Sequence, residues 1–166
     1  RVLFRSHHVH QNNVERRDRA EAITVELVLK ELDRMKFSFV YSDSQIGSQS
    51  YNGQFMFDSD SINFFAGYIC SVNPDIEHVA MGMNATDSNH SLEERRKRAD
   101  KILAAFTDVK KIYPVLNMSK REIYDMLPLP LRDMFWSCRT PIYGNTGISP
   151  CNQCKTCLQL KDAGIR

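Results

Sequence analysis

Apolar residues recur at helical spacing in two stretches of the first half of the chain. Over residues 15–35 they lie three or four positions apart, with charged side chains on the opposite face, which predicts a long amphipathic helix. A second, more apolar helix is predicted over 58–72, and Pro74 is expected to stop it. Cys70 falls on the apolar face of that helix, so we expect it to be a core residue.

Two capping boxes predict further helices. Ser91 and Glu94 form the first, and the apolar residues that follow at helical spacing predict a helix over 92–106. The second, in the stretch SKRE, precedes a short helix predicted over 120–126.

Short apolar or alternating stretches between the helices predict strands. Residues 2–10 alternate weakly and are expected to form a strand that runs into a His-rich loop. A strand over 37–41 precedes the polar stretch SDSQIGSQSYNGQ, which is predicted to be a loop of a length typical of ligand-covering segments. Two more strands are predicted, over 78–84 and over 112–116.

The predicted strands and helices alternate along the chain. This order predicts an α/β fold in which a parallel sheet carries helices on both of its faces, a Rossmann-like architecture. Ligands of such folds bind at the carboxyl ends of the strands. The segment 82–87 and the loop before Ser119 are therefore candidates for a binding site.

Composition narrows the class of protein. The 166 residues carry 22 basic and 20 acidic side chains, a net charge of +2, which is too balanced to indicate a general nucleic-acid or membrane surface. No apolar run reaches the roughly 18 residues that a membrane span requires, and the start RVLFRSHHVH lacks the apolar core of a secretory signal. We therefore expect a cytoplasmic protein, in which clustered thiols are metal ligands or catalytic groups more often than disulfides.

Four of the five cysteines lie close together near the end of the chain. Cys138, Cys151, Cys154 and Cys157 are spaced C-x12-C-x2-C-x2-C. Zinc takes four thiolates in a tetrahedron at about 2.3 Å, and C-x2-C turns bring two thiolates to one point. Because four cysteines fill the coordination shell, the spacing predicts a structural zinc ion rather than a catalytic one. The alternatives are small buried cysteines without a metal, a redox C-x2-C pair, and an iron–sulfur cluster.

Three segments taken together resemble one known family. WSC at 136–138, followed by CNQCKTCLQL at 151–160, is similar to the end of the 7-cyano-7-deazaguanine (preQ0) synthases, which reads W-S-C and then C-G-x-C-x-S-C-x-x-R. GMNATD at 82–87 resembles their G-x-N-A-x-D strand tip, and PVLNMSKREI at 114–123 resembles their P-hydrophobic-x-x-x-x-K-x-E-I segment. The resemblance spans residues 58–160.

The resemblance implies a PP-loop ligase of the adenine-nucleotide alpha hydrolase type. Such an enzyme uses ATP, with Mg²⁺, to adenylate the carboxylate of 7-carboxy-7-deazaguanine, which ammonia then attacks. A second ATP-driven step dehydrates the amide to the nitrile preQ0, a product used in queuosine or DNA-modification biosynthesis. The implied architecture is an α/β nucleotide-binding-type domain over 1–135 with a zinc-binding segment over 136–166 packed on it. A homodimer is compatible with this assignment, and neither a membrane nor direct nucleic-acid binding is expected.

The resemblance also implies which residues contact substrate or ATP. Gly82, Asn84 and Asp87 would lie at a strand tip beside the deazapurine or ATP, and Lys120 would meet phosphate charge at a helix start. Other roles stay open, because Asn84 and Asp87 could cap the following helix and Lys120 could be a solvated first-turn residue. No catalytic residue is assigned.

Two clusters of basic residues have less specific interpretations. Arg95, Arg96 and Arg98 fall in the region of an active-site Arg of the family, but they could equally form a solvated helix face. The histidines at positions 7, 8 and 10 are interpreted as part of an ordinary loop.

The chain also departs from the family. Its S-G-G-x-D-S phosphate loop does not occur in the sequence, and YNGQF at 51–55 replaces its P-G-R-N segment. Since the sequence begins at Arg1 without an initiator Met, we expect the phosphate loop to lie upstream. The alternative function, of a different class, is an inactive or repurposed homologue that binds deazaguanine or a protein partner, including in a phage or defence system. A zinc-stabilised nucleic-acid-binding protein is disfavoured by the near-neutral charge.

Overall fold

The chain folds into two compact units in a computed structural model that describes residues 4–12, 15–47, 58–87, 90–145 and 147–165. Residues 1–55 and 121–166 belong to the first unit, and residues 56–120 form the second. The domain boundary expected between residues 135 and 136 stays a prediction.

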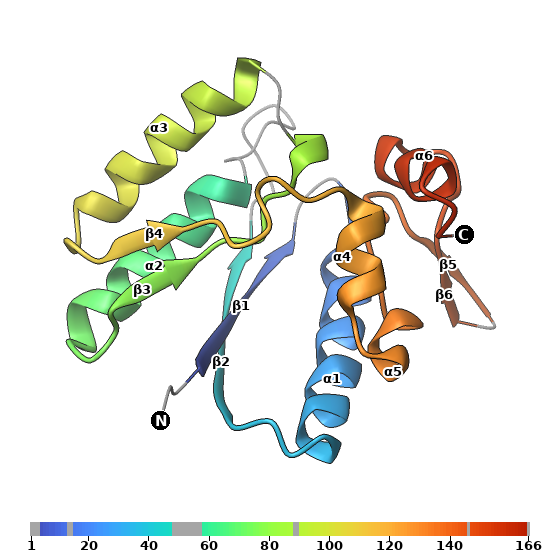
Figure 1. Cartoon of the computed structure of the whole chain (residues 1–166), viewed down its shortest axis with the longest axis horizontal. Helices are drawn as coiled ribbons and strands as arrows, with labels where there is room; N and C mark the ends of the chain where they lie inside the picture. The colour runs from blue at the N-terminus through green and yellow to red at the C-terminus, as the bar shows by residue number, and fades with distance from the viewer. Residues whose placement is uncertain (1–3, 13–14, 48–57, 88–89, 146, 166) are drawn as a thin grey trace. The chain divides into compact units, whose positions relative to one another are not determined.

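The first unit begins with a β-α-β arrangement (Figure 1). Strand β1 (Phe4–Asn12) pairs in parallel with β2 (Phe39–Gly47), and helix α1 (Asp18–Arg34) connects them and packs on β1. Parallel neighbours need such a crossover, because a tight turn can join only antiparallel strands. Val9 and Gln11 are buried on one face of β1, as the period of two in a strand requires.

The same unit continues with the second half of the chain. Helix α4 (Lys120–Met126), which belongs to this unit from Arg121 onward, is followed by the short helix α5 (Leu129–Arg132). The antiparallel hairpin of β5 (Ile142–Gly144) and β6 (Gly147–Ser149) then precedes helix α6 (Lys155–Asp162). Leu160 of α6 has no exposed surface, so this last helix contributes to the core of the unit.

The second unit contains a smaller parallel pair of strands. Helix α2 (Asp58–Val72) leads to β3 (His78–Ala80), and the single turn η1 (Ala85–Asp87) precedes helix α3 (His90–Ala104). Strand β4 (Lys110–Ile112) then pairs in parallel with β3. Helices α2 and α3 pack on one another, with Cys70, Ala99 and Leu103 buried between the elements of this unit. The prediction that Cys70 is a core residue is confirmed.

Gly67 allows a close approach within the second unit. A Cβ atom at this position would lie 2.9 Å from Cδ2 and 3.0 Å from Cβ of Phe106. Such distances are shorter than ordinary van der Waals contact, so α2 needs a residue without a side chain where the Phe106 ring crosses it. The ring of Phe106 also meets that of Phe64 edge-on, at 5.4 Å between centroids.

The structure corrects several sequence-based boundaries. The predicted strand over 37–41 extends to Gly47, so the first six residues of the predicted loop are paired with β1, while residues 48–54 lie outside the described part. Strand β3 ends at Ala80 rather than 84, and β4 occupies 110–112 rather than 112–116. In β2, backbone pairing overrides the local signal, because a polar stretch beside an existing strand can still satisfy its amides in a ladder. The hairpin, α5 and α6 were not expected from the apolar pattern.

At the level of class, the chain is a mixed α/β protein with small parallel sheets, as the alternation of elements predicts. The described strands form three separate two-stranded sheets, and two of these are parallel. One Rossmann-like sheet with helices on both faces stays a prediction. Among the described residues, no helix combines the length and apolar character needed to cross a bilayer.

Candidate metal centre

The four clustered cysteines converge in the first unit. The sulfur atoms of Cys138, Cys151, Cys154 and Cys157 all lie within 4.8 Å of one another. Cys138 and Cys157 are buried, and the other two are partly exposed. The prediction that these four residues come together is therefore confirmed, although they are separated by the β5–β6 hairpin along the chain.

The backbone delivers the last three cysteines from one tight turn. Cys151 precedes Asn152, which adopts a left-handed backbone conformation with φ of 58°. Asparagine tolerates this region better than most residues with a side chain. Cys154 then forms the N-cap of α6, and Cys157 lies in the first turn of that helix. The turn and the helix start thus point three thiols toward one place.

Hydrogen bonds from backbone amides converge on the sulfur atoms. The amide of Cys151 donates to Cys138 Sγ at 3.3 Å, and the amides of Gln153 and Cys154 donate to Cys151 Sγ at 3.5 and 3.2 Å. The hydroxyl of Thr140 donates to the same sulfur at 3.1 Å. Such donors stabilise negative charge on sulfur, which four thiolates around one cation require.

The environment separates the acidities of the four thiols. Burial raises the pKa of the Cys138 thiol and raises that of Cys157 to about 12. In contrast, the Thr140 hydroxyl and the neighbouring amides lower the pKa of Cys151. Burial opposes ionisation of Cys154, but contact with the Thr156 hydroxyl and hydrogen bonds from backbone amides lower its pKa to about 5.

The donor set fits a single tetrahedral metal ion. Four thiolates at the usual zinc–sulfur distance stand about 3.8 Å from each other, and Cys151 Sγ lies 4.0 Å from Cys157 Sγ. An iron–sulfur cluster spreads its thiolates around several metal atoms, so a group this tight favours one ion. All five described cysteines are free thiols. The cluster could therefore hold a metal ion such as zinc.

Threonines complete the surroundings of the centre in a way that spacing alone did not indicate. The Thr156 hydroxyl lies 3.2 Å from Cys154 Sγ and donates to the backbone carbonyl of Ser137. Thr140 lies two residues after one cysteine, and Thr156 lies between two others. This proximity to the cysteines in sequence was the available signal for both.

The other predicted site residues lie in the second unit. Gly82 is exposed, and a Cβ atom built there would meet nothing within 4 Å. Asn84 Oδ1 accepts hydrogen bonds from the amide of Thr86 at 2.9 Å and from its hydroxyl at 2.6 Å. Asn84 therefore caps the single turn η1, and Asp87 is the last residue of that turn. The alternative that the two residues cap the following helix, α3, stays a prediction. The proposed contacts of these residues with substrate or ATP stay predictions.

The two family-like segments of this unit are adjacent. Strand β3 leads into the segment 82–87, β4 leads into the segment 114–123, and the amide of Ala85 donates to the carbonyl of Met118 at 2.9 Å. Lys120 lies two residues after Met118 and is 6% exposed. The alternative that Lys120 is a solvated first-turn residue is therefore wrong, and its role toward phosphate stays a prediction.

The arginines and histidines occupy defined places. Arg98 of α3 binds Asp60 of α2 through two hydrogen bonds of 2.9 and 3.1 Å, so it is not part of a freely solvated face. The expectation of a His-rich loop is wrong, because His7, His8 and His10 all lie within β1. Pairing with β2 explains the difference, since His8 stands opposite Asp43 in the parallel ladder.

Comparisons with known proteins add no assignment. None of the protein-family models, curated proteins or solved structures with which the chain was compared matches it.

Proposed function

We propose that the four cysteines bind one structural zinc ion. The observation that carries this proposal is the convergence of four sulfur atoms within 4.8 Å, with backbone amides donating to Cys138 and Cys151 among them. Because four protein ligands leave no open position, the ion would brace the fold and would not activate a water molecule. Zinc bound here would hold all four sulfurs as thiolates, including the two whose burial disfavours ionisation.

A ligand variant with a matched control tests this centre. The purified chain is expected to contain zinc in an equimolar amount by elemental analysis, and Cys154→Ser is expected to lose it. Cys70→Ser is the control, since Cys70 is buried in the second unit and outside the cluster. Replacement of zinc by Co²⁺ should give the intense visible absorption of tetrahedral thiolate coordination. Iron and acid-labile sulfide in the purified protein would contradict the zinc assignment.

We further propose that the chain acts in the ATP-dependent conversion of 7-carboxy-7-deazaguanine and ammonia to preQ0. Three features support this: the resemblance of the three segments, the adjacency of two of them through Ala85 and Met118, and a buried lysine beside them. Asn84 would keep the strand tip in shape by capping η1, which leaves Gly82 open for a flat base to approach. Lys120 would supply positive charge next to this tip.

The chemistry requires a leaving group on the substrate. A carboxylate is a poor electrophile, and ATP supplies AMP as that leaving group when it is bound. The S-G-G-x-D-S loop that would hold the phosphates does not occur in this sequence, so no step through ATP is assigned to residues of this chain. The part proposed for these residues is recognition of the deazaguanine base and its carboxylate.

A second candidate function follows from that same gap. A homologue that binds deazaguanine without consuming ATP would keep the strand tip and the cysteines and would dispense with the phosphate loop. This candidate belongs to a different class, that of binding modules.

Calorimetry and turnover separate the two candidates. The full-length gene product is mixed with 7-carboxy-7-deazaguanine, ATP, Mg²⁺ and ammonia, and binding, AMP release and preQ0 are measured. Binding with AMP release and preQ0 supports the ligase, and binding without either supports the binding module. Lys120→Gln is expected to weaken binding of the carboxylate, while Lys110→Gln, on the exposed part of β4, is the control. Absence of binding to the wild-type protein rejects both candidates.

A further inference from the structure

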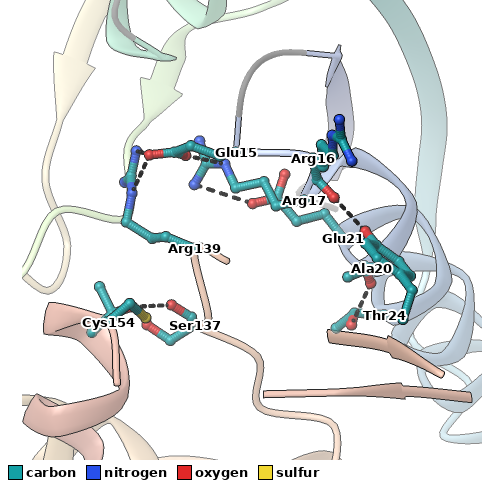
Figure 2. A network of polar contacts seen from close by, with 11 residues as sticks. Glu15, Arg16, Arg17, Ala20, Glu21, Thr24, Ser137, Arg139 and Cys154 are labelled. Carbon is teal, nitrogen blue, oxygen red and sulfur yellow. Dashed lines mark hydrogen bonds and ion pairs between the residues drawn. The ribbon is translucent and has the colours of Figure 1, made fainter. Parts of the chain in front are cut away.

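The cysteine segment (residues 136–157) contacts the turn at residues 15–17 that leads into α1, far away in the sequence. Arg139 directly follows Cys138, and its guanidinium donates two hydrogen bonds of 2.9 Å each to the two carboxylate oxygens of Glu15. Figure 2 shows these two side chains facing one another, with Arg17 on the other side of Glu15. Paired, charge-assisted bonds of this kind fix both position and orientation.

Arg139 also touches the metal centre through its backbone. Its amide hydrogen-bonds to the sulfur of Cys154. One residue therefore joins a predicted metal ligand to Glu15, which lies two residues before the N-cap of α1. Four thiolates and one divalent ion carry a formal charge of minus two, so the guanidinium would also lie beside a compensating negative charge when the metal is bound.

Tyr143 of β5 makes a second connection to the same turn. Its hydroxyl donates to the backbone carbonyl of Arg16. The amide of Ala20, in the first turn of α1, hydrogen-bonds to the same hydroxyl. Helix starts leave such amides without an internal partner, and Arg17 at the N-cap supplies no side-chain cap. Tyr143 thus performs the capping role from a distant part of the chain.

The turn held by these contacts is conformationally demanding. Arg16 adopts a left-handed backbone with φ of 51°, which is unfavourable for a residue with a side chain. Further polar contacts continue into the helix, since Arg17 pairs with Glu21 at 3.2 Å. Contacts from the cysteine segment therefore hold a turn that the local sequence does not favour.

The turn at residues 15–17 lies where ligands bind in α/β folds. It follows the carboxyl end of β1, and α/β folds bind their ligands at the carboxyl ends of parallel strands. A change in the order of this turn would alter that edge directly.

We infer that metal binding at the four cysteines is coupled, through Arg139 and Tyr143, to the order of the turn at residues 15–17 and of the first turn of α1 that follows it. These two residues are positioning residues, because they act on the turn and not on a reacting atom. This inference rests on the metal centre proposed above. Coupling is reciprocal, so the factor by which bound metal favours the ordered turn equals the factor by which the ordered turn raises the affinity for the metal. Removing a contact that carries this coupling is therefore expected to weaken metal binding.

A double-mutant cycle on the full chain tests the coupling. Zinc affinity is measured by competition with a chromophoric chelator for wild type, Glu15→Gln, Arg139→Gln and the double variant. Each single variant is expected to bind zinc about threefold to tenfold more weakly, and the double variant no more weakly than the weaker single one. Glu26→Gln is the matched control, because Glu26 lies on α1 itself and pairs with Lys30 in solvent.

Hydrogen exchange gives a second readout that does not depend on affinity. In the zinc-loaded proteins, amides of residues 18–21 are expected to exchange faster in Glu15→Gln and Tyr143→Phe than in wild type or Glu26→Gln. Exchange there should also rise when zinc is removed from the wild-type chain.

The two experiments distinguish a failure of the coupling from a failure of the proposed zinc centre. Wild-type affinity in Glu15→Gln, or equal exchange at residues 18–21 in the loaded variants, overturns the coupling while the zinc centre stands. A wild-type chain that retains no zinc instead rejects the centre, and the coupling with it.

Discussion

At the scale of single residues, His8 shows how the fold changes the acidity of a side chain. Its ring meets that of His10 edge-on at 4.4 Å on one face of β1, and its Nε2 atom is buried without a hydrogen-bond partner among the described residues. Burial and the neighbouring histidines lower the pKa of His8 from 6.5 to about 4, against the attraction of Asp43. The folded chain therefore holds this ring neutral where the unfolded chain would protonate it.

This shift predicts a loss of stability on mild acidification. Below about pH 6.5 the unfolded chain binds a proton at this ring that the folded chain does not take up until about pH 4, so the free energy of unfolding falls across that window. The full shift corresponds to roughly 3 kcal/mol, and partial exposure of the ring reduces this to about 1–2 kcal/mol. Urea denaturation at pH 7 and at pH 4.5 is expected to show a smaller difference for His8→Gln than for wild type. An unaltered difference in His8→Gln would contradict the prediction.

At the scale of elements, a half-buried ion pair joins the two helices of the second unit. Arg98 of α3 binds Asp60 of α2, and the Asp60 side chain is only 10% exposed. Loss of the guanidinium would leave a carboxylate in a poorly hydrated place. The pair therefore links the packing of α2 and α3 to one charged contact.

Arg98→Gln is expected to lower the free energy of unfolding of the second unit by about 1–2 kcal/mol, because the pair is partly open to water. Lys97→Gln is the control, since Lys97 pairs with Glu93 and Glu94 on the exposed side of the same helix. The free energy of unfolding of both variants is measured by chemical denaturation, with hydrogen exchange in residues 58–72 and 93–104 as the local readout. Equal stability of the two would mean that Arg98 contributes no more than a surface residue.

The elements also show how far local patterns reach. The predicted helices over 58–72 and 120–126 have the observed bounds, and α1 and α3 differ from prediction only at their ends. Helical spacing is read from neighbouring residues, which is why these predictions succeed. The strands differ more, because pairing with a distant segment decides where a strand ends. The polar residues 42–47 of β2 are the clearest case.

At the scale of the whole molecule, the two compact units predict an uneven response to metal removal. The four cysteines all belong to the first unit, as do the contacts of Arg139 and Tyr143. A metal that binds only the folded form stabilises the part of the chain that contains its ligands.

Chelation is therefore expected to lower the melting temperature and to accelerate hydrogen exchange in residues 15–47 and 121–165. Residues 58–87 and 93–120 should keep most of their protection. Hydrogen exchange followed by mass spectrometry, before and after chelation and after zinc is restored, measures this. A melting curve unchanged by metal removal would count against a structural centre, and equal loss of protection in both units would count against their independence.

The features that could be predicted from the residues alone are local in origin. The spacing of Cys138, Cys151, Cys154 and Cys157 indicated a common centre, because two C-x2-C steps and one more thiol can surround one ion wherever the segment lies. Apolar periodicity likewise determined most of the helices. Both signals depend on residues within a few turns of each other.

Contacts between residues far apart in the sequence, in contrast, became apparent only in the folded chain. Glu15 and Arg139 pair across 124 positions, Tyr143 takes the place of an N-cap on α1, and the histidines of β1 join a ladder instead of a loop. The burial of Lys120, which the sequence left open, is likewise a property of the folded chain. The physical reason is that a long-range partner is selected by the packing of whole elements, and no residue near either partner carries that information.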